Sequence, residues 1–154
     1  MMYRFVVFCA LVALVSANTQ VSRCVNHSGA LPDSTNIEGC TRPPCVLPQL
    51  QDAVIHLNFR APRAIRSMRT LATAYLGVIP IPYDLGQNSV TCNFLTNANC
   101  PVSANQSLRY TLRMPIEPFF PVGTQVTVEF RVVDQDNSAV VCLRVPIRIA
   151  PPRA

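Results

Sequence analysis

The chain has 154 residues but no tryptophan and no lysine, so all thirteen of its basic side chains are arginines. The absence of tryptophan excludes the Cys…Trp…Cys core of antibody domains. The five glycines form no Gly-rich phosphate-binding loop. Outside the N-terminus, no apolar run approaches the roughly 20 residues that a membrane-spanning helix needs.

Residues suited to catalysis are also scarce. His27 lies inside an Asn-X-Ser sequon, and His56 lies on the polar face of a predicted strand, where a solvated ring is the ordinary interpretation. Neither is near a serine or cysteine in an elbow motif. Asp134 and Asp136 fall in one predicted turn rather than on two sides of a cleft. The sequence therefore predicts that the protein is not an enzyme and uses no cofactor.

The formal net charge is +5. Such an excess is ordinarily a solvated surface, and it also attracts anionic membranes or acidic partner proteins. Nucleic acid is not an expected partner, because the aromatic residues do not interleave with basic runs. Four arginines recur at every third residue around a proline that argues against a helix. They predict an exposed turn that faces a membrane or a receptor: Arg60, Arg63, Arg66 and Arg69.

Residues 1–17 have the pattern of a secretory signal peptide. Arg4 precedes an apolar run over 5–15, which is too short to span a bilayer, and small residues follow at 16 and 17. We expect residues 18–154 to form one secreted, extracellular domain, with the endosomal or lysosomal lumen as the alternative destination. Sequons at Asn26 and Asn105 predict a glycoprotein if both lie on the surface.

Six cysteines follow the predicted signal peptide, and an even number in a secreted chain predicts three disulfides. Two short spacings suggest a Pro-closed loop and an Asn-rich loop, which leaves the first cysteine for the last. The suggested pairs are Cys40–Cys45, Cys92–Cys100 and Cys24–Cys142. A metal site is not expected, because no Cys-X-X-Cys pair occurs and the oxidising route disfavours zinc thiolates.

Hydrophobic periodicity of two is the strongest structural signal, and it predicts antiparallel strands with one buried face. Alternating runs cover 55–59, 71–81, 108–114, 126–132 and 139–149, and a polar hairpin loop separates the last two at 134–138. In the run 71–81 both faces are apolar or small, so the pattern does not choose the inward one. Several such strands with polar turns are typical of a β-sandwich or barrel.

Prolines mark two apolar segments as sheet edges or strand ends, because proline cannot donate to a ladder. Pro80 and Pro82 bracket Ile81 beside Tyr83, and further prolines at 115, 118 and 121 bracket Ile116 and a pair of phenylalanines. Two such stiff apolar segments would suit the mouth of a cavity. The alternative is that they are irregular edges of an ordinary core.

These motifs together resemble one family, the small soluble Niemann–Pick type C sterol carriers, within the broader ML lipid-recognition domain. The resemblance extends over the whole predicted mature chain and is greatest to divergent secreted members from arthropods. It rests on the cysteine framework and on 39–47, Phe59, Leu76-Gly77-Val78-Ile79-Pro80-Ile81-Pro82-Tyr83, Asn99-Cys100-Pro101, 110–116, Phe120-Pro121, 128–130 and 142–147.

The resemblance implies an all-β, immunoglobulin-like antiparallel sandwich of about seven strands around an internal apolar ligand cavity. It implies the same three disulfides that the spacing suggests. It also implies a mouth at Tyr83, Ile116, Phe120 and Pro121. Inward positions that resemble the cavity wall are Ile55, Leu57, Phe59, Ile81, Val126, Val128, Phe130 and Leu143. For each of these wall residues, ordinary core packing is the alternative.

Two positions depart from the sterol carriers. Tyr83 replaces a phenylalanine at the mouth, and Leu143 replaces the usual aromatic residue after the last cysteine. A tyrosine hydroxyl could donate to a ligand carboxylate or hydroxyl, so a fatty acid or oxygenated hydrocarbon suits the site as well as a sterol.

We expect a monomer that carries one small hydrophobic ligand and contacts a membrane or receptor transiently. The second hypothesis is a recognition protein that presents its lipid to a receptor, for which the arginine-rich turn would be the contact surface. The third is an adhesion module with a filled core, which would hold no extractable lipid.

Overall fold

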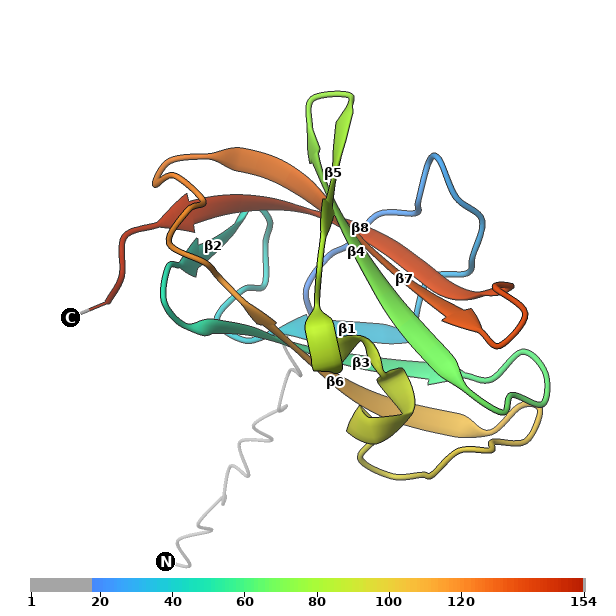
Figure 1. Ribbon diagram of the computed structural model, residues 1–154. Helices are drawn as coiled ribbons and strands as arrows, with labels where there is room; N and C mark the ends of the chain where they lie inside the picture. Colours follow the sequence, from blue (N-terminus) through green and yellow to red (C-terminus); the bar gives the residue numbers. More distant parts are fainter. Residues whose placement is uncertain (1–17, 154) are drawn as a thin grey trace, which may run out of the picture.

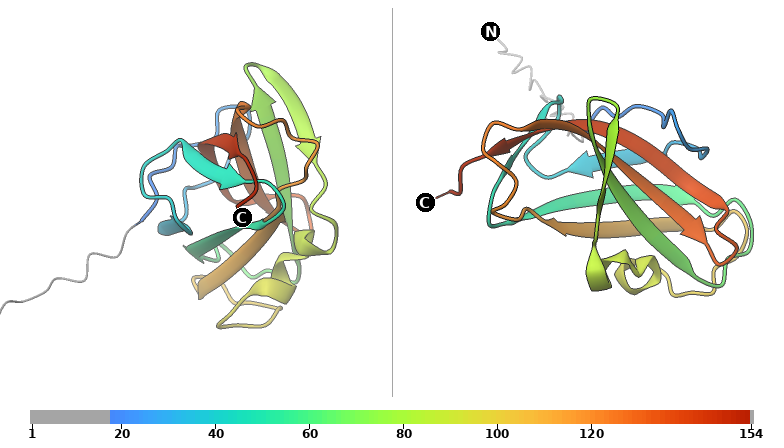
Figure 2. Two further views of the ribbon diagram at one scale, coloured as in Figure 1. Left: turned by 90° about the vertical axis from the view of Figure 1, so that its left-hand side faces the viewer. Right: turned by 45° about the horizontal axis from the view of Figure 1, so that its top comes forward.

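The computed structural model describes residues 18–153, so the predicted signal peptide lies outside the described residues. Two β-sheets pack as two layers (Figures 1 and 2). The smaller sheet has the order β1 (Ser34–Ile37), β3 (Asp52–Arg60), β6 (Ser107–Pro115). The larger has the order β2 (Cys45–Pro48), β8 (Ala139–Ala150), β7 (Gln125–Asp134), β4 (Met68–Leu76), β5 (Ile79–Tyr83). Two short 3-10 turns, η1 (Gly86–Ser89) and η2 (Thr91–Phe94), follow β5.

The all-β sandwich expected from the periodicity is confirmed, with two differences of detail. β1 and β2 have four residues each, too few for a period-two pattern to identify. β2 also pairs parallel with β8, whereas the other strand pairs are antiparallel as expected. Within the described residues, none of the helical segments has the length and apolar character to cross a membrane.

The apolar run 71–81 is two strands rather than one. The chain reverses at Gly77, whose φ of 62° lies in the left-handed region that glycine adopts without strain. Because the run folds back, Ala74 pairs with Ile81 and Ala72 with Tyr83. Both alanines are buried, so the inward face of β4 is the small one. β5 is the edge strand of its sheet, as the two prolines predict.

The core lies between the sheets in successive layers, which strand registers define. In the larger sheet the layers are Val126–Ile147, then Ile81–Ala74–Val128–Val145, then Tyr83–Ala72–Phe130–Leu143, then Thr70–Val132–Val141. The facing pairs of the smaller sheet are Ala53–Met114, Ile55–Leu112, Leu57–Tyr110 and Phe59–Leu108. Neighbouring layers are about 7 Å apart, because side chains on one face recur every second residue.

Three disulfides staple the sandwich, and they join the pairs that the spacing suggests. Cys24 is bonded to Cys142, across 118 residues of chain. Through this bond the N-terminal segment is held against the larger sheet. Ser22 and Ala30 form backbone bridges to Arg144 and Val141 along the edge of β8, and His27 contacts Glu129 on the outer face of β7. The two local disulfides are Cys40–Cys45 and Cys92–Cys100.

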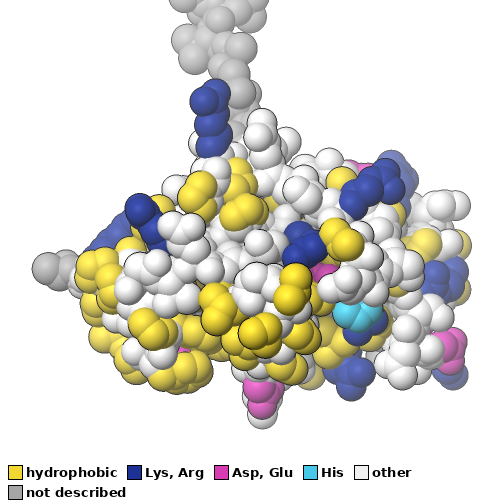
Figure 3. All heavy atoms as spheres, turned by 90° about the horizontal axis from the view of Figure 1, so that it is seen from above, with side chains coloured by type: hydrophobic (Ala, Val, Ile, Leu, Met, Phe, Trp, Pro, Cys, Tyr) yellow, Lys and Arg dark blue, Asp and Glu magenta, His cyan; other side chains and the backbone are white. Residues whose placement is uncertain are grey.

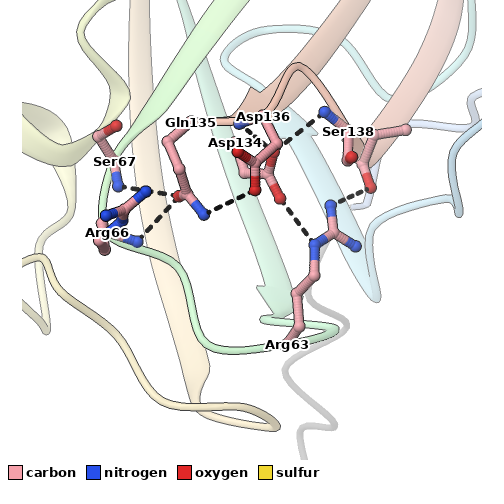
Figure 4. A network of polar contacts seen from close by, with 8 residues as sticks. Arg63, Arg66, Ser67, Asp134, Gln135, Asp136 and Ser138 are labelled. Atoms are coloured by element: carbon pink, nitrogen blue, oxygen red, sulfur yellow. Dashed lines mark hydrogen bonds and ion pairs between the residues drawn. The ribbon is translucent and has the colours of Figure 1, made fainter.

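The arginine-rich turn packs against the hairpin between β7 and β8 (Figure 4). The Arg63 Nε donates to Asp134 Oδ2 at 2.7 Å, and its second guanidinium nitrogen donates to the Ala139 carbonyl at 3.0 Å. The Gln135 side chain accepts from the backbone N–H of Arg66. This corner lies at the opposite end of the sandwich from the loop that joins β6 to β7 (Figure 1). Arg63 therefore has a structural role in fastening two loops together.

The contribution of this corner to stability depends on pH through the carboxyl group of Asp134. Burial alone would raise the pKa of its carboxyl group, but hydrogen bonds from Arg63 and from the backbone N–H groups of Ser138 and Asp136, with the Arg63 charge, outweigh it and lower the pKa below the ordinary 3.8. A carboxyl group with a lowered pKa in the folded state stabilises that state fully above its unfolded pKa and loses this contribution as the pH falls further.

We therefore expect Asp134→Asn to lower the free energy of unfolding at pH 7 and to flatten its decline below about pH 4. Urea denaturation between pH 2 and 7 measures both effects. Asp136→Asn, an exposed acid in the same loop, is the matched control. If the free energy of unfolding declined equally steeply below about pH 4 in Asp134→Asn and in wild type, the lowered pKa of Asp134 would be contradicted.

Candidate functional site

An apolar pocket lies between the two sheets near the end of the sandwich that carries the β6–β7 loop. Its volume is about 30 Å³, and its walls expose no polar surface to the space. β4, β5, β7 and β8 contribute one side and β6 the other. The lining residues are Ala74, Tyr83, Met114, Ile116, Phe120, Val126, Val128, Ile147 and Ile149.

A second, more open groove adjoins this inner pocket and has a volume of about 300 Å³. Three residues line both spaces, namely Ala74, Tyr83 and Phe120. They form the boundary between the interior and the surface. The groove is further lined by Ile81, Pro82, Asp84, Glu117 and Phe119. We call this groove and its boundary the mouth.

Aromatic rings close the mouth. The Tyr83 and Phe120 ring centroids are 5.7 Å apart, and those of Phe119 and Phe120 are 4.6 Å apart. The Tyr83 hydroxyl donates to the backbone carbonyl of Pro115, which ends β6 in the opposite sheet. The Gln49 side chain donates to the Phe120 carbonyl and so fixes the loop. A few contacts therefore hold the two sheets together at this end.

The Tyr83 hydroxyl stays protonated over the physiological range. Burial raises the pKa of this phenol, and the negative charges of Glu117, Asp52 and Asp84 raise it further. The sequence suggested that this hydroxyl could donate to a ligand. In the structure its single proton is engaged by the Pro115 carbonyl, so a ligand would have to displace that contact.

The size of the inner pocket limits what it can hold in this conformation. A volume of about 30 Å³ is on the scale of one or two water molecules, whereas pockets for small organic ligands have volumes of roughly 300–1,000 Å³. A larger guest requires the Phe120 loop to move and the sheets to separate. Ala74 leaves space next to the pocket, and the unbranched Met114 side chain can adapt to a guest.

The structure brings six of the twelve sequence-predicted site residues together around the mouth. Tyr83, Ile116, Phe120, Val126 and Val128 line the inner pocket, and Ile81 lines the groove. The other six line neither space. Pro121 is exposed on the β6–β7 loop, while Ile55, Leu57, Phe59, Phe130 and Leu143 are buried in the deeper layers of the core. A ligand contact for these five stays a prediction.

Four lining residues of the inner pocket were not predicted: Ala74, Met114, Ile147 and Ile149. Three of them were recognisable, because Met114, Ile147 and Ile149 lie on inward faces that the alternation identifies. Ala74 was ambiguous, since both faces of its run are apolar or small. In the groove, Pro82 and Phe119 belong to the two proline-marked segments that the sequence offered for a mouth, although neither was among the predicted site residues. Asp84 and Glu117 were missed, because loop positions carry no periodic signal.

The histidines lie away from the mouth. His27 Nδ1 lies 2.7 Å from Glu129 Oε1 under the N-terminal segment, and His56 contacts Thr111 and Glu38 on the outer face of the smaller sheet. Among residues 18–153, one group has the spacing of metal ligands, namely Cys24, Glu129 and Cys142. Its two sulfurs are joined as a disulfide, so they are not thiolates that could bind a metal.

Exposed hydrophobic side chains gather on the β4–β5 hairpin and the β6–β7 loop, the two segments that line the mouth. Figure 3 shows them gathered on the face from which the β4–β5 hairpin projects. Val78 at the hairpin tip is 92% exposed and Phe119 on the β6–β7 loop is 70% exposed. The others are Leu76, Ile79, Ile81 and Val122. Concentrations of exposed apolar side chains are typical of protein, membrane and ligand-binding surfaces.

Comparison with known proteins yields a consistent set of similarities. A family model described as the ML domain matches residues 18–149. A Drosophila melanogaster protein named NPC intracellular cholesterol transporter 2 homolog a is 23% identical over 146 residues, which cover 94% of this chain and 96% of that protein. NPC intracellular cholesterol transporter 2 from Bos taurus is 22% identical over 126 residues, covering 82% and 81%.

Among solved structures, the fold is similar to that of a Niemann-Pick type C2 protein from the Japanese carpenter ant. The TM-score is 0.70 at 15% sequence identity, and the match covers 84% of this chain and 98% of the ant protein. At this identity the likeness bears on the fold alone.

Proposed function

Because the chain belongs to the ML-domain family, we propose that it carries one small hydrophobic ligand between its two sheets and transfers it without chemical change. The observation that carries this proposal is the wholly apolar pocket that opens through an aromatic mouth into a rim of exposed apolar side chains. The curated relatives whose names describe cholesterol transporters support the same class of cargo.

The hydrophobic effect supplies enough free energy for such a carrier. Each buried CH₂ group contributes about 0.8 kcal/mol, so a chain of about 16 carbons gains on the order of 13 kcal/mol. Association costs roughly 4–15 kcal/mol, and at the lower end of this range the remainder of about 8–9 kcal/mol corresponds to an affinity in the micromolar range. A carrier has to release its ligand, and this moderate affinity suits that requirement.

The direct test is native mass spectrometry of the purified protein, followed by solvent extraction and identification of what is released. One lipid per chain is the expected result. A bare protein that also fails to bind fluorescent sterol and fatty-acid probes would exclude the carrier and favour an adhesion module with a filled core.

The charges at the mouth favour a ligand with an uncharged head group. The groove is lined by Asp84 and Glu117 and by no arginine, although the chain has an excess of arginine. Asp52 is a third acid whose charge acts on Tyr83. A neighbouring groove, which shares Pro82, Tyr83 and Asp84 with the mouth, is lined by Arg69 and Arg131 on the outer face of the sheet. A fatty carboxylate held at this mouth would be repelled, whereas an alcohol or a sterol hydroxyl would not.

We therefore expect the wild-type protein to bind hexadecanol more tightly than hexadecanoate by about tenfold at low ionic strength, with a smaller ratio in 1 M salt. The double variant Asp84→Asn, Glu117→Gln is expected to bring the two affinities within about threefold of each other. Competition against a fluorescent probe measures the ratio. Asp136→Asn, at the far end of the sandwich, is the control that leaves it unchanged. A preference for the carboxylate in wild type would contradict this assignment of the ligand class.

We also propose that the exposed apolar rim makes transient contact with a membrane, or with a receptor, while the ligand enters or leaves. An apolar path from one interior to the other would spare the ligand contact with water. Secretion as a glycoprotein monomer is part of the same proposal. The three disulfides and the exposed positions of Asn26 and Asn105 support it.

A further inference from the structure

Three buried hydroxyl groups join the two sheets one layer beyond Ala72 and Phe130, on the side away from the β6–β7 loop. Thr70 on β4 and Tyr110 on β6 share a hydrogen bond with their oxygens 2.7 Å apart, and Thr70 and Thr91 share another at 2.8 Å. None of the three side chains is more than 1% exposed. We call Thr70, Thr91 and Tyr110 the hydroxyl cluster.

The backbone reinforces this connection. The segment that carries Thr91 forms a bridge to β4 through Val90 and Arg69 and a bridge to β6 through Leu95 and Tyr110. The Cys92–Cys100 disulfide fixes the same segment. The sheets are therefore tied here by side chains and by backbone. At the β6–β7 end they are linked by the Tyr83 hydroxyl and by the backbone N–H groups of Gln49 and Leu50, which donate to the carbonyls of Ala150 and Ile116.

The cluster remains intact over the physiological pH range. Burial raises the pKa of Tyr110 to about 12, although hydrogen bonds with Thr70 and Thr91 act in the opposite direction. To insert a hydrocarbon chain between Thr70 and Tyr110 would break their bond and leave buried hydroxyls without partners, which costs roughly 1–3 kcal/mol for each group. Nearer the mouth, the hydroxyl group that links the sheets is that of Tyr83, which donates to the Pro115 carbonyl at the rim, and the β4 members of these layers are the alanines 74 and 72.

We propose that the hydroxyl cluster ends the ligand cavity, so that the protein selects ligands by length. This inference rests on the proposed carrier function. The distance along β7 from Val126, which lines the outermost layer of the inner pocket, to Val132 beside Thr70 is six residues, or about 20 Å. An extended chain of about 16 carbons has that length, because each carbon–carbon bond of about 1.5 Å advances a zigzag chain by roughly 1.3 Å. Leu57 and Phe59, beside and beyond Tyr110, then lie outside the cavity.

Unbranched primary alcohols of 10 to 20 carbons are the probes that test this limit. In wild type we expect the affinity to rise by about fourfold for each added carbon and to level off near 16 carbons. Tyr110→Leu removes the hydroxyl and the ring, and opens one further layer of about 7 Å. We expect it to raise the affinity for the 20-carbon alcohol, relative to the 16-carbon alcohol, by at least about tenfold.

Two further variants make the result decisive. Tyr110→Phe keeps the ring and removes the hydrogen bond with Thr70. We expect it to raise the affinity for the 20-carbon alcohol, relative to the 16-carbon alcohol, by about threefold or more. This variant tests the limit even if Tyr110→Leu does not fold. Phe59→Leu loses similar volume one layer beyond the cluster and should leave the ratio unchanged.

An unchanged ratio in both Tyr110 variants, or an equal shift in Phe59→Leu, would overturn the depth limit while leaving the carrier function standing. Failure of wild type to bind any alcohol in the series would instead overturn the carrier function, and this inference with it.

Discussion

Replacing Ala74 with phenylalanine is expected to lower the affinity for a hydrophobic ligand by roughly 100-fold or more. Ala74 is one of the three residues that line both the inner pocket and the groove, so a ring at this position occupies the path between them. The ligand then loses both the space and the contacts of several methylene groups. The extra ring strains a packed core, and we expect the fold to survive with a cost of about 1–3 kcal/mol.

The matched control is Thr73→Phe, which adds a ring at the neighbouring position on the other face of β4. Thr73 lines a groove on the outer surface of the sheet and neither space at the mouth. Displacement of a fluorescent probe and the amount of co-purified lipid report binding, and thermal denaturation reports folding. Wild-type affinity in a folded Ala74→Phe variant would show that the ligand lies elsewhere.

Removing the disulfide between Cys24 and Cys142 is expected to have the largest effect on stability. This bond closes a loop with a sequence separation of 118, and the chain-entropy model assigns about 5 kcal/mol to a loop of that length. The double variant Cys24→Ala, Cys142→Ala should also release the N-terminal segment from the outer face of the larger sheet. Glu129, which is 2% exposed under that segment, would then become accessible to solvent.

Urea denaturation measures the loss in the free energy of unfolding. Hydrogen exchange of β7 and β8 reports whether the N-terminal segment has been released from them. The control is Cys40→Ala, Cys45→Ala, whose sequence separation is 5 and for which the same model gives about 2 kcal/mol. Equal losses in the two double variants would mean that backbone contacts of the N-terminal segment, rather than loop closure, account for the stabilisation.

Alternation could be read from the sequence wherever one face of a strand is apolar and the other polar. Val126 and Val128 alternate with Thr127 and Glu129, and the structure lines the inner pocket with both valines. The inward face of β4 could not be predicted in this way, because its inward residues at 72 and 74 are alanines and its outward residues include the aromatic Tyr75. Tyr75 is buried beneath Arg144, whose guanidinium lies 4.8 Å from the ring centroid. Hydrophobic periodicity does not predict that a side chain from another strand will bury an outward-facing ring.

The sequence also could not predict how far from the mouth each inward-facing side chain lies in the core. Phe59 and Ile55 have the same inward orientation on β3, yet only the register with β6 places Phe59 beside Leu108 and beyond Tyr110. The hydroxyl cluster was also missed, because its three members come from β4, η2 and β6. Contacts between distant segments carry no local signal. Of the mouth residues that the family resemblance implies, Tyr83 and Phe120 lie at the boundary between the inner pocket and the groove.

The two prolines of β5 have a consequence for self-association. A strand at the edge of a sheet offers unpaired N–H groups to which another chain can add. β5 is such an edge and also carries the exposed Ile79 and Ile81, which would otherwise make it a seed for polymerisation. Pro80 and Pro82 have no N–H group to offer at alternate positions. The exposed apolar side chains of this edge can therefore be present at high protein concentration without the sheet of one copy extending into that of the next.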